Sequence, residues 1–367
     1  MQTHILTDNE YKSYLEFSQK YNIPYKRGTT GILDFFNKIC DKYRMEISSV
    51  FTDPNWKVFI DTGIELFDEM RSIISKILCW ELKDDNHSVM VLLDDTIKQF
   101  IKKGYFFEFE IPADQNFYRI RKSNTIVKKT GTLHIPFSKK AYAAQERFSI
   151  MNEPMLYLGN TTYICWEECN RPDFSSAYVS LYSLKVPLKV IGIEEVIPNL
   201  FPQISKANVT AYFITRCIAF FPFVAAMFMK ATPAVNGKIS EYIFPNMFMK
   251  ALMRLRDADG IIFHSTKYNL IETSSMLCKN LALKCPEELT RDFSTYILDK
   301  FTITTPVPLN SYPIPKQFYY KCGYNGMPLS LDDRFVINYE DSLFAFAEDE
   351  MKHMCCSGEV LDKSDYY

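Results

Sequence analysis

The segment RFSIMNEPMLYLGNTTYICWEECNRPD, residues 147–173, decides how the middle of this chain folds. Its apolar stretch at 155–158 has the composition of a short strand. Asn160 follows after one glycine, and because asparagine is a favoured N-cap, a helix is expected to begin after it. The segment therefore predicts a strand that passes straight into a helix carrying two glutamates, Glu167 and Glu168.

The two glutamates are expected to face different surroundings. Residues spaced three, four and seven apart share one face of a helix, which places Glu168 with Ile164 and Cys165. If these apolar residues pack into the core, Glu168 faces inward with them, where a carboxylate needs an ion pair or hydrogen bonds. Glu167 shares a face with Tyr163 and is expected to face water. The alternative is a short helix with both glutamates exposed.

Residues 1–104 are expected to form a helical N-terminal module. Apolar residues recur at helical spacing in three segments, 31–51, 56–82 and 89–104. The last segment carries lysines in its final turn and stops at Gly104, as helices commonly do. No catalytic motif occurs in this part of the chain, so its expected role is to support the domain that follows or to dock a partner.

After Gly104 the sequence changes to a mixture of strand and helix patterns. Strands are expected within 105–111 and 116–123, around 132–135, and within 177–193 and 260–266, and helices at 209–228 and 241–256. This mixture makes α+β the expected fold class, with a domain at 105–304. Prolines after Thr305 predict an extended connector, and an acidic, aromatic tail completes the third segment, 305–367.

The composition argues against several classes of protein. The formal net charge is −2, which provides no electrostatic footprint for nucleic acid or anionic lipid. The longest apolar run, 217–229, is too short to span a bilayer and contains a proline. The N-terminal residues lack the pattern of a signal peptide, and the ten cysteines form neither a disulfide framework nor a zinc pattern. The expected location is the cytoplasm, with reduced thiols and no bound metal.

Common catalytic motifs are absent from the sequence. With 12 glycines, the chain contains no G-x-G-x-x-G, no P-loop and no G-x-S-x-G, and it lacks H-E-x-x-H. The ordinary sequence support for a Rossmann dehydrogenase, a P-loop NTPase, an α/β-hydrolase or a zincin is therefore missing. An active site has to be built from dispersed side chains.

Several polar residues on the expected strands are candidates for such a site. Arg119 and Arg121 share one strand face, where they form either a solvated face or a pair of guanidiniums aimed at an anion. Taken singly, Arg147 is typical of a surface ion pair and Tyr157 of a core residue. Ser265 follows an apolar strand, where its hydroxyl either reaches a neighbouring cleft or caps a turn.

Taken in order, these residues resemble a known family, the RES domain, which is named for its arginine, glutamate and serine. The order is an arginine on a strand, an arginine ten residues before a tyrosine, a glutamate eleven after it, and a serine about a hundred further on. The resemblance covers roughly residues 105–300, and the central block is its most specific part. It is carried by FYRIR (117–121), LHIPFS (133–138), RFSIMNEPMLYLGNTTYICWEE (147–168), EYIFPNMFM (241–249) and DGIIFHST (259–266).

The resemblance implies a fold similar to that of ADP-ribosyltransferases, with a mixed, split sheet and helices around a cleft. Known members of the family are toxins, often paired with an antitoxin, that deplete cellular NAD. Residue by residue, Arg119 and Arg147 match the two family arginines, Tyr157 the tyrosine, Glu168 the glutamate and Ser265 the serine.

Two positions depart from the family pattern. Asn246 stands where the family often has glutamine, and His264 stands where it often has tyrosine. Both residues are candidates for substrate binding. The amide of Asn246 has a shorter reach than that of glutamine, and the imidazole of His264 replaces the phenol ring of tyrosine with a different polar ring. A further histidine, His134, lies in apolar surroundings and is more typical of a structural residue than of a catalytic one.

The substrate that the resemblance implies is NAD, with no resident cofactor. Cleavage of the nicotinamide–ribose bond builds oxocarbenium character on the ribose, which a fixed carboxylate, Glu168, can stabilise. The matched arginines, with Arg121 beside the first, can hold the diphosphate. Tyr157 can stack on the nicotinamide or ribose, and Ser265 can hydrogen-bond the carboxamide or a ribose hydroxyl.

The expected function is that of an NAD-consuming, toxin-type enzyme, either a glycohydrolase or a phosphorylase. The alternatives are an ADP-ribosyltransferase that modifies a macromolecule and a non-catalytic interaction module with a RES fold. Expected partners besides NAD are an antitoxin or other regulatory protein and a second copy of the chain, because such an activity has to be restrained in its own cell. Neither nucleic acid nor a membrane is an expected partner. The acceptor and the oligomeric state stay open.

Overall fold

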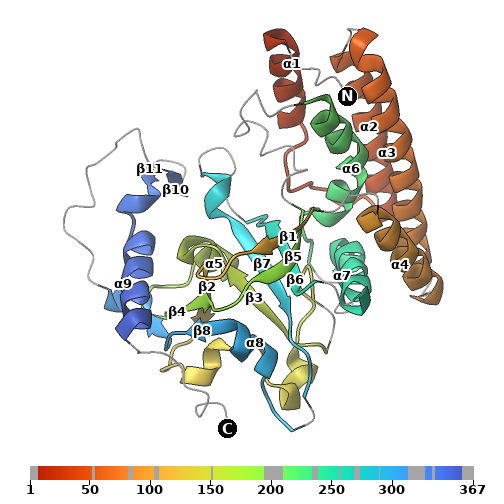
Figure 1. The fold of residues 1–367 in the computed structure, drawn as a ribbon. Helices are drawn as coiled ribbons and strands as arrows, with labels where there is room; N and C mark the ends of the chain where they lie inside the picture. The colour runs from red at the N-terminus through yellow and green to blue at the C-terminus, as the bar shows by residue number, and fades with distance from the viewer. Residues whose placement is uncertain are drawn as a thin grey trace. The chain divides into compact units, whose positions relative to one another are not determined.

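The computed structural model contains a helical part and a part organised around a sheet (Figure 1). It divides into two compact units, each assembled from separate stretches of the chain. Unit 1 comprises Met1–Phe107, Gln145–Ile150 and Ile193–Arg256, and unit 2 comprises Glu108–Ala144, Met151–Gly192 and Asp257–Tyr367. The structure describes residues 7–51, 54–81, 86–102, 107–149, 152–193, 210–233, 239–255, 258–267, 273–288, 290–312, 327–332 and 335–357.

These units follow a different division from the three segments expected from the sequence. The segment 1–104 shares its unit with 193–256, because two later helices pack against the N-terminal ones. The segment 305–367 shares unit 2 with the sheet. The boundaries at 104 and 304 therefore stay a prediction. Within the expected connector and tail, residues 313–326, 333–334 and 358–367 lie outside the described residues.

Unit 1 is built mainly of helices in its described residues, which confirms the expected helical N-terminal region. Its α-helices are α1 (Asp8–Gln19), α2 (Ile32–Val50), α3 (Pro54–Glu81), α4 (Asn86–Lys102), α6 (Ala211–Met227) and α7 (Ile243–Leu255). The apolar run at 217–229 lies mostly in α6, which is largely buried, as expected for a helix that is apolar all round. Within the described part of the chain, no helix combines the length and apolar character needed to cross a membrane.

The core of unit 1 contains a stack of aromatic rings from three helices. Tyr43 of α2 stacks on Phe67 of α3 and on Phe221 of α6, with ring centroids 5.8 Å and 3.7 Å away and nearly parallel rings, and the two phenylalanine rings are 6.2 Å apart. All three side chains are buried. Aromatic pairs add about 0.5–1.5 kcal/mol to the burial of their surface. Tyr43 therefore holds three helices together.

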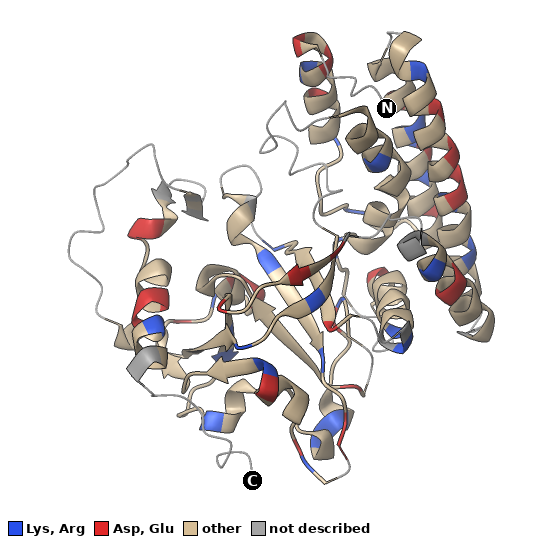
Figure 2. Ribbon diagram, viewed as in Figure 1, with Lys and Arg blue, Asp and Glu red and all other residues tan. Residues whose placement is uncertain are grey.

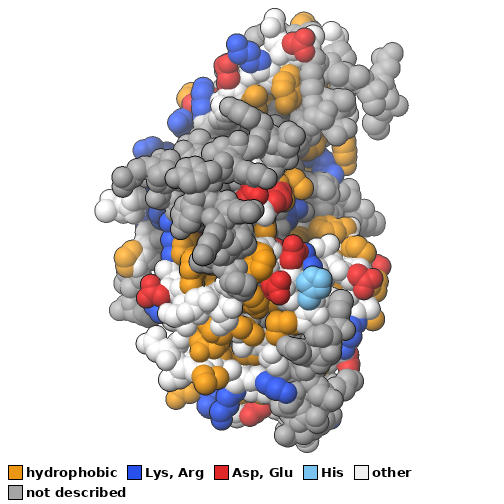
Figure 3. Space-filling model, turned by 90° about the vertical axis from the view of Figure 1, so that its left-hand side faces the viewer, with side chains coloured by type: hydrophobic (Ala, Val, Ile, Leu, Met, Phe, Trp, Pro, Cys, Tyr) orange, Lys and Arg blue, Asp and Glu red, His pale blue; other side chains and the backbone are white. Residues whose placement is uncertain are grey.

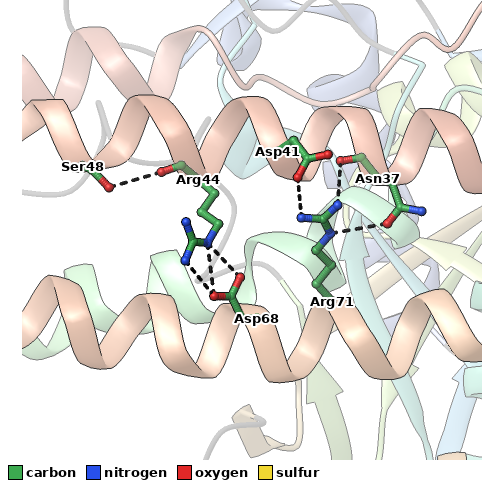
Figure 4. A network of polar contacts seen from close by, with 6 residues as sticks. All are labelled: Asn37, Asp41, Arg44, Ser48, Asp68 and Arg71. Atoms are coloured by element: carbon green, nitrogen blue, oxygen red, sulfur yellow. Dashed lines mark hydrogen bonds and ion pairs between the residues drawn. The ribbon is translucent and has the colours of Figure 1, made fainter.

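Charged side chains join α2 and α3 along their exposed side (Figure 4). Arg44 donates to both carboxylate oxygens of Asp68, at 2.9–3.1 Å. Arg71 donates to Asp41 at 2.6 Å and also contacts Asn37. Positive and negative side chains are interspersed along these helices (Figure 2). Exposed pairs contribute only about 0.2–1 kcal/mol each, so apolar packing carries most of the stability.

Unit 2 is organised around a mixed sheet, which confirms the expected α+β class. Its strands are β1 (Phe107–Ile111), β2 (Asn116–Lys122), β3 (Met155–Gly159), β4 (Ala177–Leu184), β5 (Leu188–Gly192), β6 (Gly260–His264), β7 (Lys279–Lys284), β8 (Phe301–Ile303) and β9 (Val307–Pro308). The order is β1-β5-β6-β7-β3-β2-β4-β8, with β9 beside β4. β5 and β6 run parallel, whereas β6, β7, β3, β2 and β4 are antiparallel to their neighbours in that order. A separate hairpin joins β10 (Pro328–Asp332) and β11 (Phe335–Asn338).

The sheet is weakly joined between β2 and β3, which pair only through Tyr118 and Gly159. On its other side, β2 pairs with β4 along its whole length. The two strands therefore diverge beyond one residue pair, and each leaves backbone groups without a partner in the sheet. This is a local split in the sheet. The similarity to ADP-ribosyltransferases as a whole stays a prediction.

Each face of the sheet is covered by its own apolar layer. On β2 the side chains alternate, so that Phe117 enters one layer and Tyr118 the other. The first layer includes α8 (Thr295–Lys300), and the second includes α5 (Thr162–Glu168) and α9 (Leu343–Ser357). The short helix α5 thus lies between the sheet and α9.

The strand expected around 132–135 does not form, because a 3₁₀ turn at Lys129–Thr132 is followed by a loop. His134 links this loop of unit 2 to the start of α8. Its Nε2 accepts a hydrogen bond from the Ser294 N–H at 2.9 Å, and its Nδ1 lies 2.8 Å from the carbonyl oxygen of Ile135. Ser294 is the N-cap residue of α8. Burial lowers the pKa of His134 to about 4, so the ring is neutral at pH 7. Both ring nitrogens serve the fold, as expected for a structural histidine.

Replacing Tyr43 by alanine is expected to lower the free energy of unfolding by about 3–5 kcal/mol, because it removes a buried ring and leaves a cavity between three helices. Urea unfolding followed by circular dichroism measures the effect. Met45→Ala is the matched control, since Met45 lies on the same helix and is 71% exposed. Equal midpoints for the two variants would contradict the assigned role of Tyr43.

The neutral state of His134 predicts a pH dependence of stability. Between pH 6.5 and about 4 the unfolded chain binds a proton that the folded histidine resists, so stability falls as the pH drops through this window. The total effect is about 3 kcal/mol, at about 1.4 kcal/mol per pKa unit. His134→Gln keeps an acceptor near Ser294 without a titrating ring, and should flatten this part of the curve. Urea unfolding from pH 4 to 7 tests this, with the exposed His353→Gln as control.

Candidate active site

Glu168, the last residue of α5, is the centre of a group of polar side chains in unit 2. Its Oε1 accepts hydrogen bonds from Ser265 Oγ at 2.6 Å and from Asn280 Nδ2 at 2.7 Å. Lys267 Nζ lies 3.5 Å from Oε2, and the Glu168 side chain is 33% exposed. These four residues are called the Glu168 cluster below. They hold one carboxylate in a defined orientation, with Oε2 the less engaged oxygen.

Ser265 comes directly after β6 and is 1% exposed. Its hydroxyl donates to Glu168 and accepts from the Lys267 N–H at 3.1 Å. Its own N–H donates to the carbonyl oxygen of Cys278 at 2.9 Å. The hydroxyl therefore joins the cluster and stabilises a turn at the same time. In this arrangement its single proton is committed to Glu168.

The sequence reasoning missed Asn280 and Lys267. Asn280 is a buried amide in the otherwise apolar β7, and its position among apolar residues was the available signal, because a buried amide has to find partners. Lys267 donates from Nζ to the carbonyl oxygen of Glu168 at 2.7 Å and to Asn170 Oδ1 at 3.3 Å. A cation there suits the C-terminal end of α5. Its only sequence signal was its place two residues after Ser265.

Gly159 allows α5 to lie close to the sheet. A Cβ at this position would come within 2.6 Å of both Ile164 Cγ2 and Cys165 Sγ. Thr161, the N-cap, accepts a hydrogen bond from the Ile164 N–H at 3.2 Å through its side chain. Because α5 is short and begins immediately after β3, this close approach also carries the end of the helix to β7.

The expected exposure of Glu167 was wrong. Its side chain is 3% exposed and forms an ion pair with Arg171, with Oε1 2.8 Å from Nη2. The helical face that Glu167 shares with Tyr163 is not open to solvent, because it packs against α9, where the Tyr163 and Phe344 rings are 5.6 Å apart. The periodicity argument assumed one buried face. Glu168 is instead the more exposed of the two glutamates because it lies at the end of the helix.

Arg119 and Arg121 extend from the same face of β2, as alternating residues of a strand do. Arg121 donates to the carbonyl oxygens of Gly131 at 3.1 Å and Leu133 at 2.7 Å. The nearby positive charge of Arg119, and then burial, lower the pKa of Arg121. Arg119 Nε is buried and has no hydrogen-bond partner among the described residues. Two close guanidiniums with an unused donor form a site of positive potential.

Tyr157 and Arg119 lie on opposite faces of the sheet. The Tyr157 side chain shares its face with Asn280, since it pairs in register with Ala282, two residues further along β7. Arg119 shares the face of Phe117 instead, and its Nη1 donates to the backbone oxygen of Tyr157 at 2.5 Å. Of these two candidates, only Tyr157 thus extends from the face that carries the Glu168 cluster.

Arg147 lies in unit 1 and binds the end of α6. Its Nη1 donates to the carbonyl oxygen of Met227 at 2.6 Å and its Nη2 to that of Met229 at 3.0 Å. The guanidinium also lies 5.1 Å from the centre of the Tyr242 ring. Arg147 is 7% exposed, so it is not the exposed ion pair that its position alone suggested. Its role toward a diphosphate stays a prediction.

Asn246 also lies in unit 1, where its amide holds the segment 145–147. Its Oδ1 accepts from Gln145 Nε2 at 2.7 Å, and its Nδ2 donates to the carbonyl oxygens of Glu146 at 2.7 Å and Arg147 at 2.9 Å. These contacts give the side chain a structural function. A substrate contact by Asn246 stays a prediction.

His264 is the last residue of β6 and is 1% exposed. It pairs in register with Lys279, so its side chain leaves the sheet on the face opposite to that of Phe263 and Asn280. Burial, and then the charge of Lys279, lower the pKa of His264 to about 3. The ring is therefore neutral at physiological pH, and its expected substrate contact stays a prediction.

A metal site is not visible in the part of the chain that the structure describes, where no group of three or more histidine, cysteine, aspartate or glutamate side chains could hold an ion. The chemistry available to the Glu168 cluster is that of a fixed carboxylate, hydrogen-bond donors and one exposed lysine. Such a group can stabilise a positive charge that develops on a bound molecule.

Comparison with known proteins gives one informative similarity. No family model matches the chain, and no solved structure matches it. The chain is similar to "Putative toxin YopC" of Bacillus subtilis (strain 168), with 26% identity over 318 residues, which cover 80% of this chain and 70% of that protein. Neither unit contains so large a share of the chain, so the similarity extends over parts of both. The RES assignment stays a prediction.

Proposed function

We propose that the protein is a toxin-type enzyme that consumes NAD by cleaving the bond between nicotinamide and ribose. The observation that carries this proposal is the partly exposed Glu168 carboxylate, held at Oε1 by Ser265 and Asn280 at 2.6 Å and 2.7 Å. The resemblance to the RES domain supports it, as does the similarity to a protein that is named as a toxin.

The geometry of the Glu168 cluster suits this reaction. As the N-glycosidic bond breaks, positive charge develops on the ribose, and a carboxylate that is already oriented stabilises that charge without reorganising. Ser265 and Asn280 provide the orientation through Oε1, which leaves Oε2 to accept from a ribose hydroxyl. Nicotinamide leaves as a neutral molecule, so the step requires no proton donor. Tyr157 extends from the same face, and in this proposal its ring stacks on the ribose or the nicotinamide.

The arginine pair on β2 provides a place for the negative part of NAD. The unused Nε of Arg119 is a donor that a diphosphate oxygen can satisfy. A bound anion would also relieve the repulsion between Arg119 and Arg121 that lowers the Arg121 pKa. In this proposal Arg147 and Asn246 support the fold of unit 1 and His264 supports that of unit 2, since their described contacts are structural or buried.

The acceptor distinguishes three forms of the reaction. Free ADP-ribose beside nicotinamide indicates hydrolysis, and ADP-ribose 1″-phosphate formed only with phosphate indicates phosphorolysis. ADP-ribose bound to protein or nucleic acid indicates transfer. Liquid chromatography of the products with and without phosphate separates these outcomes. Absence of nicotinamide release by the purified protein would favour a non-catalytic interaction module.

Glu168→Gln is expected to lower the rate of nicotinamide release by about 100-fold or more, because the amide keeps the size of the side chain but loses its negative charge. The assay is chromatographic detection of nicotinamide from NAD. Glu153→Gln makes the same chemical change at an exposed position of unit 2 and should retain the wild-type rate. An active Glu168→Gln protein would rule out the proposed centre.

Ser265→Ala and Asn280→Ala are each expected to lower kcat about 10-fold, because each removes one of the two bonds that orient Glu168 Oε1. The double variant should lose less than the product of the two single effects, since both residues act on the same oxygen. Steady-state kinetics of the four proteins form the test. Fully independent effects would show that the two side chains do not act through Glu168.

A further inference from the structure

A second buried carboxylate contacts the start of the helix that carries Glu168. Glu348 of α9 is 7% exposed, and its Oε1 accepts hydrogen bonds from the Thr162 N–H at 2.6 Å and from Thr162 Oγ1 at 3.0 Å. The hydroxyl of Tyr339 also donates to Glu348. The donors thus come from two separate segments of unit 2 and converge on one carboxylate oxygen.

This contact completes the N-terminal end of α5. The first N–H groups of a helix have no partner within it, and the Thr161 side chain satisfies that of Ile164. Glu348 satisfies that of Thr162. A carboxylate is also the favoured charge at this end of a helix dipole. Because the whole helix rises only about 10 Å, a shift of its first residue is transmitted to Glu168 at its end.

Aromatic packing holds α9 against α5. The Phe344 ring lies 5.6 Å from that of Tyr163 and 5.5 Å from that of Trp166. Thr162 Oγ1 also lies 3.2 Å from the carbonyl oxygen of Phe344. On its outer side, α9 exposes polar residues such as Asp349, and the face of the molecule around it mixes acidic and apolar side chains (Figure 3). Glu348 is therefore on the inner side of an amphipathic helix.

We propose that Glu348 is a positioning residue for Glu168: from α9 it fixes the start of α5 and so keeps the Glu168 carboxylate aligned with Ser265 and Asn280. Glu348 makes no contact with the Glu168 cluster itself among the described contacts. Its effect passes through the two turns of α5. The kinetic consequence of this inference rests on the proposed NAD cleavage.

A conservative variant can separate positioning from charge. Burial raises the pKa of Glu348 to about 7, so near neutral pH a fraction of the protein carries the uncharged carboxyl. Glutamine resembles that form and can still accept from the Thr162 N–H and from the Tyr339 hydroxyl. Alanine provides no acceptor and leaves the Thr162 N–H without one.

The experiment compares kcat and KM for nicotinamide release from NAD in full-length Glu348→Ala, Glu348→Gln and wild type. We expect kcat of the alanine variant to fall about 10-fold with KM within about twofold, and glutamine to restore most of kcat. Asp349→Ala truncates the neighbouring, exposed carboxylate of α9 and should keep the wild-type kcat. Thermal unfolding confirms that each protein is folded. If Glu348→Ala does not fold, Thr162→Val is measured instead, because it removes the hydroxyl that contacts Glu348 and keeps the backbone N–H. We then expect kcat to fall about threefold.

Hydrogen–deuterium exchange of the α5 amides gives a second readout that does not depend on catalysis. The alanine variant should exchange faster across 162–169, and the glutamine variant should retain protection. Wild-type kcat and wild-type exchange in Glu348→Ala would overturn the positioning role. If wild type releases no nicotinamide, the proposed function fails, and exchange alone then decides whether Glu348 positions α5.

Discussion

The two hydrogen bonds to Glu168 Oε1 depend on how the strands and helices of unit 2 are arranged, because the donors and the acceptor come from different elements. Their donors come from β7 and from the residue directly after β6, and the antiparallel register of these strands brings Ser265 and Asn280 side by side. The acceptor comes from a helix, which has to lie close to the sheet to reach them. Gly159 permits that approach because it has no side chain between β3 and α5. A carboxylate at the end of a short helix can then be ordered and still partly exposed.

The Glu168 carboxylate and the guanidiniums of Arg119 and Arg121 lie in different parts of unit 2. This separation suits the proposed substrate, which carries both a positive and a negative group. The Glu168 cluster lies on one face of the sheet, and the pair Arg119 and Arg121 on the other. Between them β2 and β3 are joined by a single residue pair, and Arg119 spans the two strands through its bond to the Tyr157 carbonyl. The proposed substrate, NAD, combines a negative diphosphate with a positive nicotinamide ring, and these two parts correspond to the two kinds of charged side chain.

The sequence was sufficient for many of the elements and for part of the candidate site, but it did not predict α1, β7, α8 or α9. Strong periodicity predicted α6, β2, β4 and β5 close to their observed bounds, because these patterns depend only on local spacing. Glu168 and Ser265, which the sequence singled out as candidates, are joined by a hydrogen bond, although 97 residues separate them. Periodicity failed for Glu167, because one helix face cannot reveal that a later segment covers the other. Asn280 was missed because its partner, Glu168, is distant in sequence. A single amide among apolar residues indicates that some partner exists, but it does not indicate which residue that partner is.

The place of α9 in the chain affects when the site can become complete. Glu348 follows Thr162 by 186 residues, and α9 comes after every other described element of unit 2. At a synthesis rate of about 5–20 residues per second, roughly 10–40 s pass between the two. During that interval the nascent chain already contains Glu168 and lacks the helix that covers α5. In a protein with the proposed activity, the contact that positions α5 would therefore form only after Glu348 has been synthesised, which delays the cleavage of NAD until that point.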